Sequence, residues 1–224
     1  MKSVSFFNSL VSQILLFLGL FSVVISIGIL TNQLRLSKKE THDRYAAKTE
    51  TAARLAASFI SAEDIDFYLE TLEDDDNYIR LLDTLRSIQT ISGMTYIFVT
   101  QIADDGEFFV FDTDPEADTH MALGSFSDWE QSGIDSQLQL VLSAGKKPAP
   151  YISETEWGFF LSAREPIYRH DGTTAGYAGT NFYMDTVLAA QANLFRTNII
   201  VTILIFLATN IKIVTIMLVR NKFA

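Results

Sequence analysis

The sequence predicts an α+β fold in which a long N-terminal helix covers an antiparallel sheet of about five strands, with a transmembrane helix on either side. Three observations predict it. Apolar runs long enough to cross a membrane lie near both ends of the chain. Helical periodicity dominates residues 31–92, and hydrophobic alternation with a period of two, broken by turn residues, begins at Thr95.

The first apolar run is the stronger of the two. No residue from 3 to 34 is charged, and 10–30 is long enough for a helix across a hydrocarbon core of about 30 Å. A cleaved signal peptide is the alternative, but its apolar core spans only about 7 to 15 residues. The second run, 198–219, contains Lys212, which could mark an ion path or snorkel toward the interface near Arg220.

The charges orient the chain across a membrane. All 27 acidic residues lie between Glu40 and Asp185, whereas the short ends carry only basic residues, Lys2 at one end and Arg220 with Lys222 at the other. By the positive-inside rule both termini, 1–9 and 220–224, are cytoplasmic, and the domain 31–197 is outside. Three basic residues directly after the first span weigh against this orientation: Arg35, Lys38 and Lys39.

Composition excludes some functions. So acidic a domain repels nucleic acid, which is bound through basic side chains. The chain has no cysteine, so disulfides, thiol catalysis and thiolate metal sites are excluded.

Helices occupy the first half of the domain. The Ala-rich segment from Thr31 to about Ile60 predicts one long helix able to pack closely against a flat surface. Ser61, with Asp64 three residues on, has the pattern of a capping box that begins a second helix. A third helix follows, with apolar residues at helical spacing from Tyr78, and Gly93 ends it.

Strands form the second half. TYIFVTQIA and EFFVFDTD flank Asp104-Asp105-Gly106, which indicates a hairpin with a three-residue loop. A loop, a helix at 134–143 and a short strand at 151–155 follow. The last hairpin turns at Asp171-Gly172, and its second strand leads into the helix that enters the membrane.

The turn of the last hairpin predicts which residues share a face. A two-residue turn at Asp171-Gly172 places Arg164 opposite Gly179 and Ser162 opposite Asn181. A bulge at Pro166 would move these residues to different faces. In the first hairpin, Ala103 opposite Glu107 gathers Tyr96, Phe98, Thr100, Val110, Asp112 and Asp114 on one face.

Two such faces, with aromatic rings and a few polar groups, have the composition of a pocket for a small molecule. The candidate ligand-binding residues are Arg164, Asn181, Tyr96, Phe98, Asp112, Asp114, Ser162, Tyr168 and Tyr177. Arg164 suits a carboxylate, which favours an organic anion, whereas Asp112 or Asp114 could accept from an amine or hydroxyl. The alternative is an internal pair between Arg164 and an aspartate with no ligand.

The order of a membrane span, a long helix, YIFV, FDTDP, LG and EWGFFLSAREPIYRHDGTTAGYAGTNF resembles the extracytoplasmic, PAS-like sensor domains called Cache or PDC. The resemblance covers about residues 35 to 195. It implies a ligand between the sheet and the loops above it, and a domain at the front of a chemoreceptor, sensor kinase or diguanylate cyclase of the bacterial cytoplasmic (inner) membrane. Asn181 stands where amino-acid-sensing members carry an aspartate that contacts the amine, and the position of Arg164 commonly holds an aromatic or small residue.

The leading hypothesis is therefore a membrane-bound, homodimeric sensor that binds a small molecule outside the cell and passes a helix shift to a cytoplasmic signalling module or partner. No such module follows the second span in this sequence, so the output belongs to a partner or a longer receptor. No cofactor is indicated.

Other function classes remain open. An enzyme is disfavoured because no histidine lies in a recognised catalytic motif. A divalent-cation sensor would use the carboxylates of Asp112, Asp114, Glu116 and Asp118, spaced as in an EF-hand loop that lacks its glycine and closing glutamate. A scaffold without a ligand is the last alternative.

Overall fold

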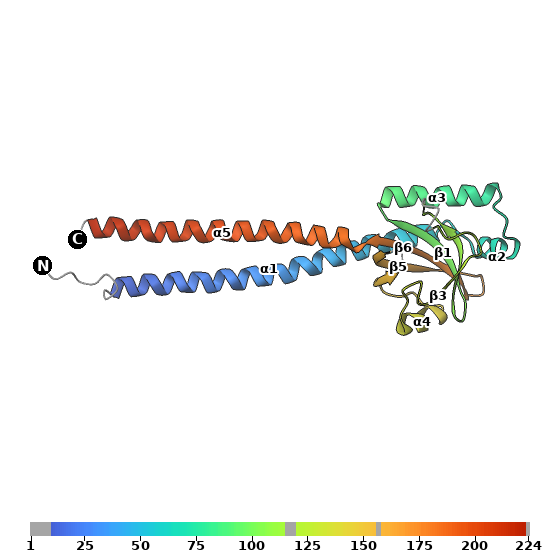
Figure 1. The fold of residues 1–224 in the computed structure, drawn as a ribbon, viewed down its shortest axis with the longest axis horizontal. Helices are drawn as coiled ribbons and strands as arrows, with labels where there is room; N and C mark the ends of the chain where they lie inside the picture. Colours follow the sequence, from blue (N-terminus) through green and yellow to red (C-terminus); the bar gives the residue numbers. More distant parts are fainter. Residues whose placement is uncertain (1–9, 115–119, 156–157, 223–224) are drawn as a thin grey trace. The chain divides into compact units, whose positions relative to one another are not determined.

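The computed structural model describes residues 10–114, 120–155 and 158–222 (Figure 1). The chain divides into two units. One is the domain His42–Leu188, and the other combines Met1–Thr41 with Ala189–Ala224. Helix α1 (Leu10–Ala57) and helix α5 (Met184–Lys222) each run from one unit into the other.

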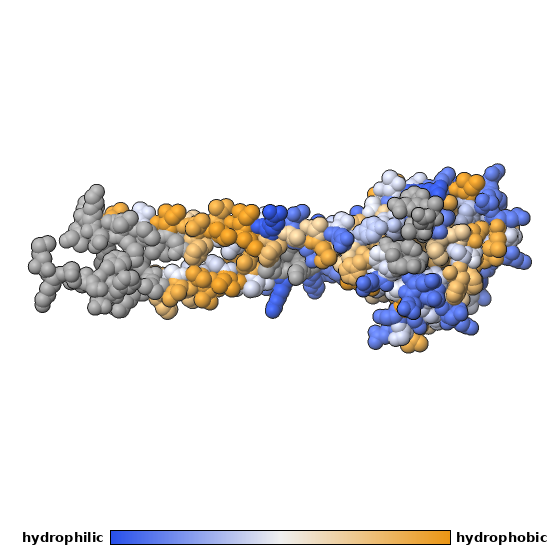
Figure 2. All heavy atoms as spheres, viewed as in Figure 1, coloured by the Kyte–Doolittle hydropathy of each residue, from blue (hydrophilic) through white to orange (hydrophobic). Residues whose placement is uncertain are grey.

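The second unit consists, where it is described, of the outer parts of α1 and α5. Within the described residues, one helical segment is long and apolar enough to cross a membrane, Met184–Ala208, and a shorter apolar segment lies at Phe17–Asn32. Two spans were expected, and part of the first, 10–30, lies outside the residues whose side chains are described. Large apolar side chains on both helices are exposed, among them Phe17 and Ile205, and Figure 2 shows hydrophobic residues gathered along them.

The helices of the domain begin and end where their capping residues predict. Helix α2 (Ala62–Thr71) starts with the capping box of Ser61 and Asp64. Helix α3 (Asp76–Ser92) is capped by Asp75, whose carboxylate accepts the Tyr78 N–H, and Gly93 ends it in the left-handed conformation. These boundaries confirm the predicted helices.

The sheet has six antiparallel strands rather than about five. They are β1 (Tyr96–Ile102), β2 (Gly106–Asp112), β3 (Phe126–Asp128), β4 (Tyr151–Thr155), β5 (Gly158–Tyr168) and β6 (Thr174–Tyr183), in the spatial order β3-β2-β1-β6-β5-β4. The additional strand, β3, was predicted as loop because three residues are too few to show alternation. Helix α4 (Ser136–Ser143) lies on the opposite side of the sheet from α3 (Figure 1).

The last hairpin has the predicted register along most of its length. Arg164 lies opposite Gly179 and Ser162 opposite Asn181. The turn itself is one residue longer than predicted, since the Arg169 N–H donates to the Thr173 carbonyl and Gly172 has a φ of 85°. The pairing shifts between Ile167 and Tyr168, not at Pro166, so this irregularity compensates for the longer turn.

The first hairpin departs from the predicted register at its tip. The loop has two residues, because the Ala103 N–H donates to the Gly106 carbonyl, and Glu107 lies opposite Ile102 rather than Ala103. A shift between Val99 and Thr100 then restores the expected pairing of Phe98 with Asp112. Gly106, assigned to the loop from sequence, is the first residue of β2, where a Cβ would lie 2.2 Å from the Ser127 carbonyl oxygen.

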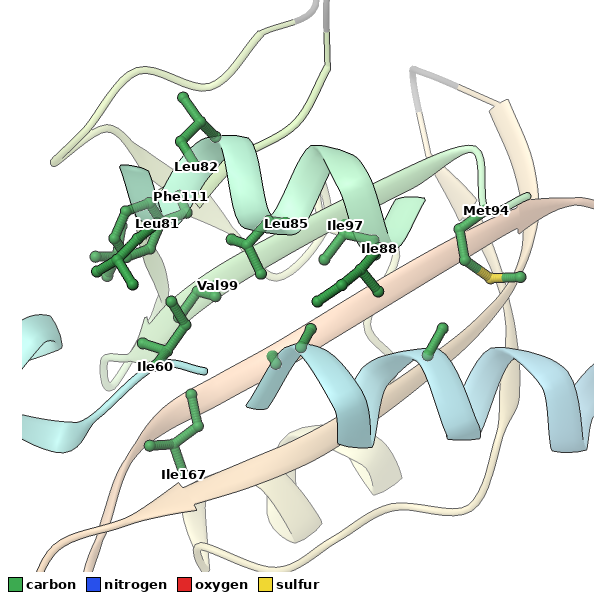
Figure 3. Packing of buried hydrophobic residues seen from close by; sticks show 14 of the residues in the cluster. Ile60, Leu81, Leu82, Leu85, Ile88, Met94, Ile97, Val99, Phe111 and Ile167 are labelled. Atoms are coloured by element: carbon green, nitrogen blue, oxygen red, sulfur yellow. The ribbon is translucent and has the colours of Figure 1, made fainter. Parts of the chain in front are cut away.

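The main core lies between one face of the sheet and helices α1, α2 and α3. Figure 3 shows Leu85 and Ile88 of α3 directed toward Ile97 and Val99 of β1. The predicted Ala-rich segment of α1 packs on the same face through Ala52 and Ala56, which are almost fully buried. Ile91, expected on the buried face of α3, is exposed.

This packing predicts the effect of enlarging an alanine in α1. Ala56→Leu places three extra carbons against a flat, filled surface, and we expect it to lower the free energy of unfolding by about 1–3 kcal/mol. Ala47→Leu, on the exposed side of the same helix, is the matched control and should change it little. Urea unfolding of the full chain followed by tryptophan fluorescence measures both, because Trp129 and Trp157 belong to the domain. Equal losses in the two variants would contradict the close packing of α1.

Candidate functional site

A cavity of about 50 Å³ opens on the face of the sheet that α1 and α3 do not cover. Side chains from β1, β2, β4, β5 and β6 converge on it because alternate residues of each strand point to the same face. Its lining consists of Tyr96, Phe98, Glu107, Phe109, Asp112, Asp114, Met121, Ser132, Tyr151, Ser153, Thr155, Ser162, Arg164 and Asn181. Four ionisable side chains that are at least 95% buried therefore meet in one place: Glu107, Asp112, Asp114 and Arg164.

Arg164 is held by Glu107 at the back of the cavity. Its two terminal nitrogens donate to the two carboxylate oxygens of Glu107 at 2.5 and 2.9 Å. Nη1 also donates to Thr100 Oγ1 at 3.1 Å, Nε donates to the Tyr151 hydroxyl at 2.8 Å, and the guanidinium carbon lies 5.1 Å from the centre of the Phe98 ring. All three guanidinium nitrogens are thus engaged by the protein.

Burial and ion pairing have opposite effects on the pKa of Glu107 and on the pKa of Arg164. Burial alone would raise the pKa of Glu107, but the attraction and hydrogen bonds of Arg164 outweigh it, so the pKa of Glu107 lies below its ordinary value. Burial likewise opposes the charge on Arg164, yet Glu107 raises the pKa of Arg164 above its ordinary range. Both groups are charged, as a bidentate pair removed from water.

Asp112 and Asp114 lie at the end of β2 and just beyond it. One carboxylate oxygen of Asp112 accepts the Asp114 N–H at 3.0 Å, and the other accepts the Met121 N–H at 2.8 Å. Asp112 therefore connects the backbone just after β2, at Asp114, to the backbone at Met121. Burial raises the pKa of Asp112 above its ordinary value, although the two backbone N–H groups act against that rise.

A row of hydroxyl and amide groups crosses three strands beside the cavity. The Ser162 hydroxyl donates to the Asn181 side-chain oxygen at 2.8 Å and lies 2.8 Å from the Ser153 hydroxyl. At the same edge the Tyr96 and Tyr183 hydroxyls are 3.0 Å apart, and the Tyr183 ring stacks on Phe160. Tyr183 is the last residue of β6 and directly precedes α5.

Seven of the nine candidate residues named from sequence line this cavity. The other two do not. Tyr168 is more than half exposed. Tyr177 is buried on the same face as Arg164, but its hydroxyl donates to the carbonyls of Leu142 and Lys146, so it secures the end of α4 instead.

Seven lining residues were missed: Met121 and Ser132 lie in loops, and two reasons account for the other five. Tyr151, Ser153 and Thr155 alternate along β4, a strand that was predicted but not aligned with its neighbour, so alternation could have found them. Glu107 and Phe109 were assigned to the core face because the hairpin tip was aligned one residue away from its true register.

A second, larger cleft of about 610 Å³ lies between α4 and the tips of the two hairpins. It is lined mainly by small residues from Leu142–Gly145 and Gly172–Tyr177, and its arginine, Arg169, is paired with Asp66. Because buried polar groups converge on the smaller cavity and not on this cleft, the smaller cavity is the candidate site.

The other chemistries considered from sequence find less support. Among the described residues no three His, Cys, Asp or Glu side chains are grouped as a metal site would require. Glu116 and Asp118 of the proposed cation-binding loop lie outside the described residues. Each histidine lies within 4 Å of a carboxylate, but in the described part of the chain none hydrogen-bonds a serine.

The ion pair predicts a non-additive mutational pattern. Glu107→Gln or Arg164→Met alone leaves one buried charge without its partner, and we expect each to lower the free energy of unfolding by about 3–5 kcal/mol. The double variant removes both charges and should lose less than either single variant. Urea unfolding followed by tryptophan fluorescence tests the pattern, and additive losses would show that the two charges are not coupled.

The same pair predicts how stability depends on pH. Because the folded-state pKa of Glu107 lies below its ordinary value of 4.5, its contribution is complete above that value and is lost as the pH falls through the lowered pKa. Below pH 4.5 the stability of the wild type should therefore fall more steeply than that of the Glu107→Gln/Arg164→Met variant, which keeps every other carboxylate. Parallel curves in urea unfolding would contradict this.

Comparisons with known proteins give structural similarity only. No family model and no curated protein matches this chain. The sensor domain of Escherichia coli DcuS is 17% identical, with a TM-score of 0.48, and the match covers 69% of this chain and 98% of that one.

Two further solved structures are similar at a comparable level. The ligand-binding domain of the Campylobacter jejuni chemoreceptor Tlp3, in complex with 4-methylisoleucine, is 10% identical with a TM-score of 0.47, covering 84% of this chain and 66% of that one. The periplasmic domain of Vibrio cholerae LuxQ is 12% identical with a TM-score of 0.41, covering 73% and 70%. Similarity at this level concerns the fold alone and implies nothing about what this chain binds.

Proposed function

We propose that this chain is a membrane-anchored sensor whose domain binds a small polar solute outside the cell and passes a helix shift inward. The observation that carries the proposal is the cavity. It gathers four buried ionisable side chains, aromatic rings and a row of hydroxyl groups beside a strand that continues directly into α5. Such a set of convergent polar groups is costly to bury and typical of a ligand site.

The volume of the cavity limits the size of the solute. At about 10–15 Å³ for one water molecule, 50 Å³ holds roughly three to five water-sized groups. A solute of that size fits without rearrangement, and a larger one requires the surrounding side chains to move.

A route from the cavity to α5 is short. Tyr96 lines the cavity, its hydroxyl lies 3.0 Å from that of Tyr183, and Met184 begins α5. Met184 and Val187 are buried in the core, so a displaced Tyr183 would move the first turn of the helix with it. A shift of about 1–2 Å is the expected scale.

Exposed side chains of α5 support the membrane part of the proposal, and those of α1 support the dimer part. Apolar side chains exposed along Met184–Ala208 suit a lipid environment, with the acidic domain outside and both termini in the cytoplasm. For a homodimer, α1 offers its exposed side, which includes Ala47 and Leu55, because Ala52 and Ala56 already face the core. The output belongs to a cytoplasmic module or partner.

The scaffold alternative is favoured by one observation. An arginine fully paired with an aspartate of its own protein was the arrangement expected of a domain without a ligand, and Arg164 is paired in this way with Glu107 rather than with Asp112. The same hypothesis expects no void, whereas a cavity remains beside the pair. A direct binding experiment therefore separates the two.

The test uses the full chain in lipid nanodiscs with a panel of amines, amino acids, organic acids, Ca²⁺ and Mg²⁺. A solute that binds the folded domain raises its unfolding temperature. We expect Ser162→Leu, which fills the cavity, to abolish that rise, and Ser87→Leu, an exposed position on α3, to retain it. Since the chain has no cysteine, a fluorophore on Thr186→Cys reports movement of α5 when the solute binds.

Each outcome decides one part of the proposal. If no solute in the panel stabilises the protein, and tryptophan fluorescence shows that the protein is folded, the result would argue against a sensor and for the scaffold. Stabilisation by Ca²⁺ or Mg²⁺ alone would favour the cation sensor. A solute that binds without changing the fluorophore signal would leave binding intact and contradict the transmission step.

A further inference from the structure

The row of hydroxyl and amide groups beside the cavity leaves one donor and one acceptor open to a solute. We infer that the solute is a small uncharged amide. Its carbonyl oxygen accepts from Asn181 Nδ2, its N–H group donates to Ser153 Oγ, and its alkyl part lies against the aromatic rings of the cavity. This inference rests on the proposed function and assigns the chemical class of its solute.

Ser162 sets the direction of the hydrogen bonds in this row. Its hydroxyl donates to Asn181 Oδ1 at 2.8 Å, and a hydroxyl has a single proton to donate. The proton in the 2.8 Å contact between Ser162 and Ser153 therefore comes from Ser153. Ser153 Oγ keeps its own lone pairs as acceptors, and among the described residues no group donates to it. Ser153 thus offers an acceptor to the cavity that it lines.

Asn181 supplies the open donor. Its side-chain oxygen accepts from Ser162, so Nδ2 is the part of this amide that remains for a ligand. Within the part of the chain that the structure describes, no acceptor pairs with Nδ2. The side chain is partly buried and lines the cavity. A carbonyl oxygen that enters the cavity would therefore give Nδ2 a hydrogen bond without breaking one within the protein.

Ions match these two open groups less well than an amide does. A carboxylate can accept from Asn181, but it has no proton for Ser153 and would enter a cavity lined by three acidic side chains and one basic one. That basic side chain, Arg164, is already bound by Glu107. An ammonium or amidinium group can donate to Ser153 but cannot accept from Asn181. A neutral amide satisfies both groups and carries no charge that must be removed from water.

The size and the walls of the cavity also suit a small amide. Its volume of about 50 Å³ holds roughly three to five water-sized groups, which is the size of a primary amide with a short alkyl chain. The rings of Tyr96, Phe98 and Phe109 line the cavity as well and offer an apolar surface to that chain. Acetamide is therefore the simplest probe.

The experiment compares three probes of the same planar shape and different charge: acetamide, acetate and acetamidinium. Each is titrated at matched ionic strength against the full chain in nanodiscs, and binding is followed by the NMR signals of the probe, which report weak binding. We expect acetamide to bind at least about 10-fold more tightly than either ion, because each ion leaves one of the two open groups without a partner. This comparison needs no variant. Tighter binding of either ion, or equal binding of all three, would overturn the inference and leave solute binding in the cavity intact.

Paired variants test the donor. Asn181→Asp keeps an oxygen for the Ser162 hydroxyl but removes Nδ2, so the affinity for acetamide should fall by about 10-fold or more. Gln137→Glu makes the same change from amide to carboxylate at an exposed position of α4 and should alter the affinity by less than about 2-fold. Equal effects of the two variants would overturn the assignment to Asn181. Failure of every probe to bind would overturn the inference too, while the broader panel decides separately whether the domain is a sensor.

Discussion

The ion pair of Arg164 and Glu107 is the interaction on which the open face of the sheet depends. It joins β5 to β2 across the two strands between them, and it engages Thr100 of β1 and Tyr151 of β4 as well. Four strands are thus connected through one guanidinium. A pair so buried is stable only when nearly every donor and acceptor is matched, which is the condition that these contacts meet.

The pair forms because of the strand pairing in both long hairpins. In each, the register at the tip is offset by one residue, and a register shift farther along the strands compensates for the offset. In β2, Val110 is the extra residue, so Glu107 and Phe109 before it face the cavity and so does Asp112 after it. Regular pairing would send either Glu107 or Asp112 to the apolar core. In the last hairpin a longer turn and a shift after Ile167 cancel, which leaves Arg164 opposite Gly179. The bulge therefore lets Glu107 and Asp112 line the same cavity, with Glu107 bound to Arg164.

That placement changes the chemical reading of the cavity. An arginine on an aromatic strand suggests an anion when its neighbours are unknown, whereas Arg164 is bound by Glu107, so the protein itself balances its charge. The core on the other face of the sheet is apolar and holds α1, α2 and α3, so one face of the sheet carries the apolar core and the other carries the cavity.

Sequence patterns were sufficient to predict the α+β class, the long first helix, the capped helices, most of the strands and the pairing of Arg164 with Gly179. These follow from local patterns: periodicity, capping residues and turns. It also named seven residues of the cavity. The tertiary structure was needed to find strand β3 and the register at the tip of the first hairpin. That register sets the partner of Arg164, so the pair with Glu107 could not be predicted from sequence. A one-residue difference in pairing reverses the face of a side chain, and that difference depends on contacts between strands rather than on the residues of any one of them.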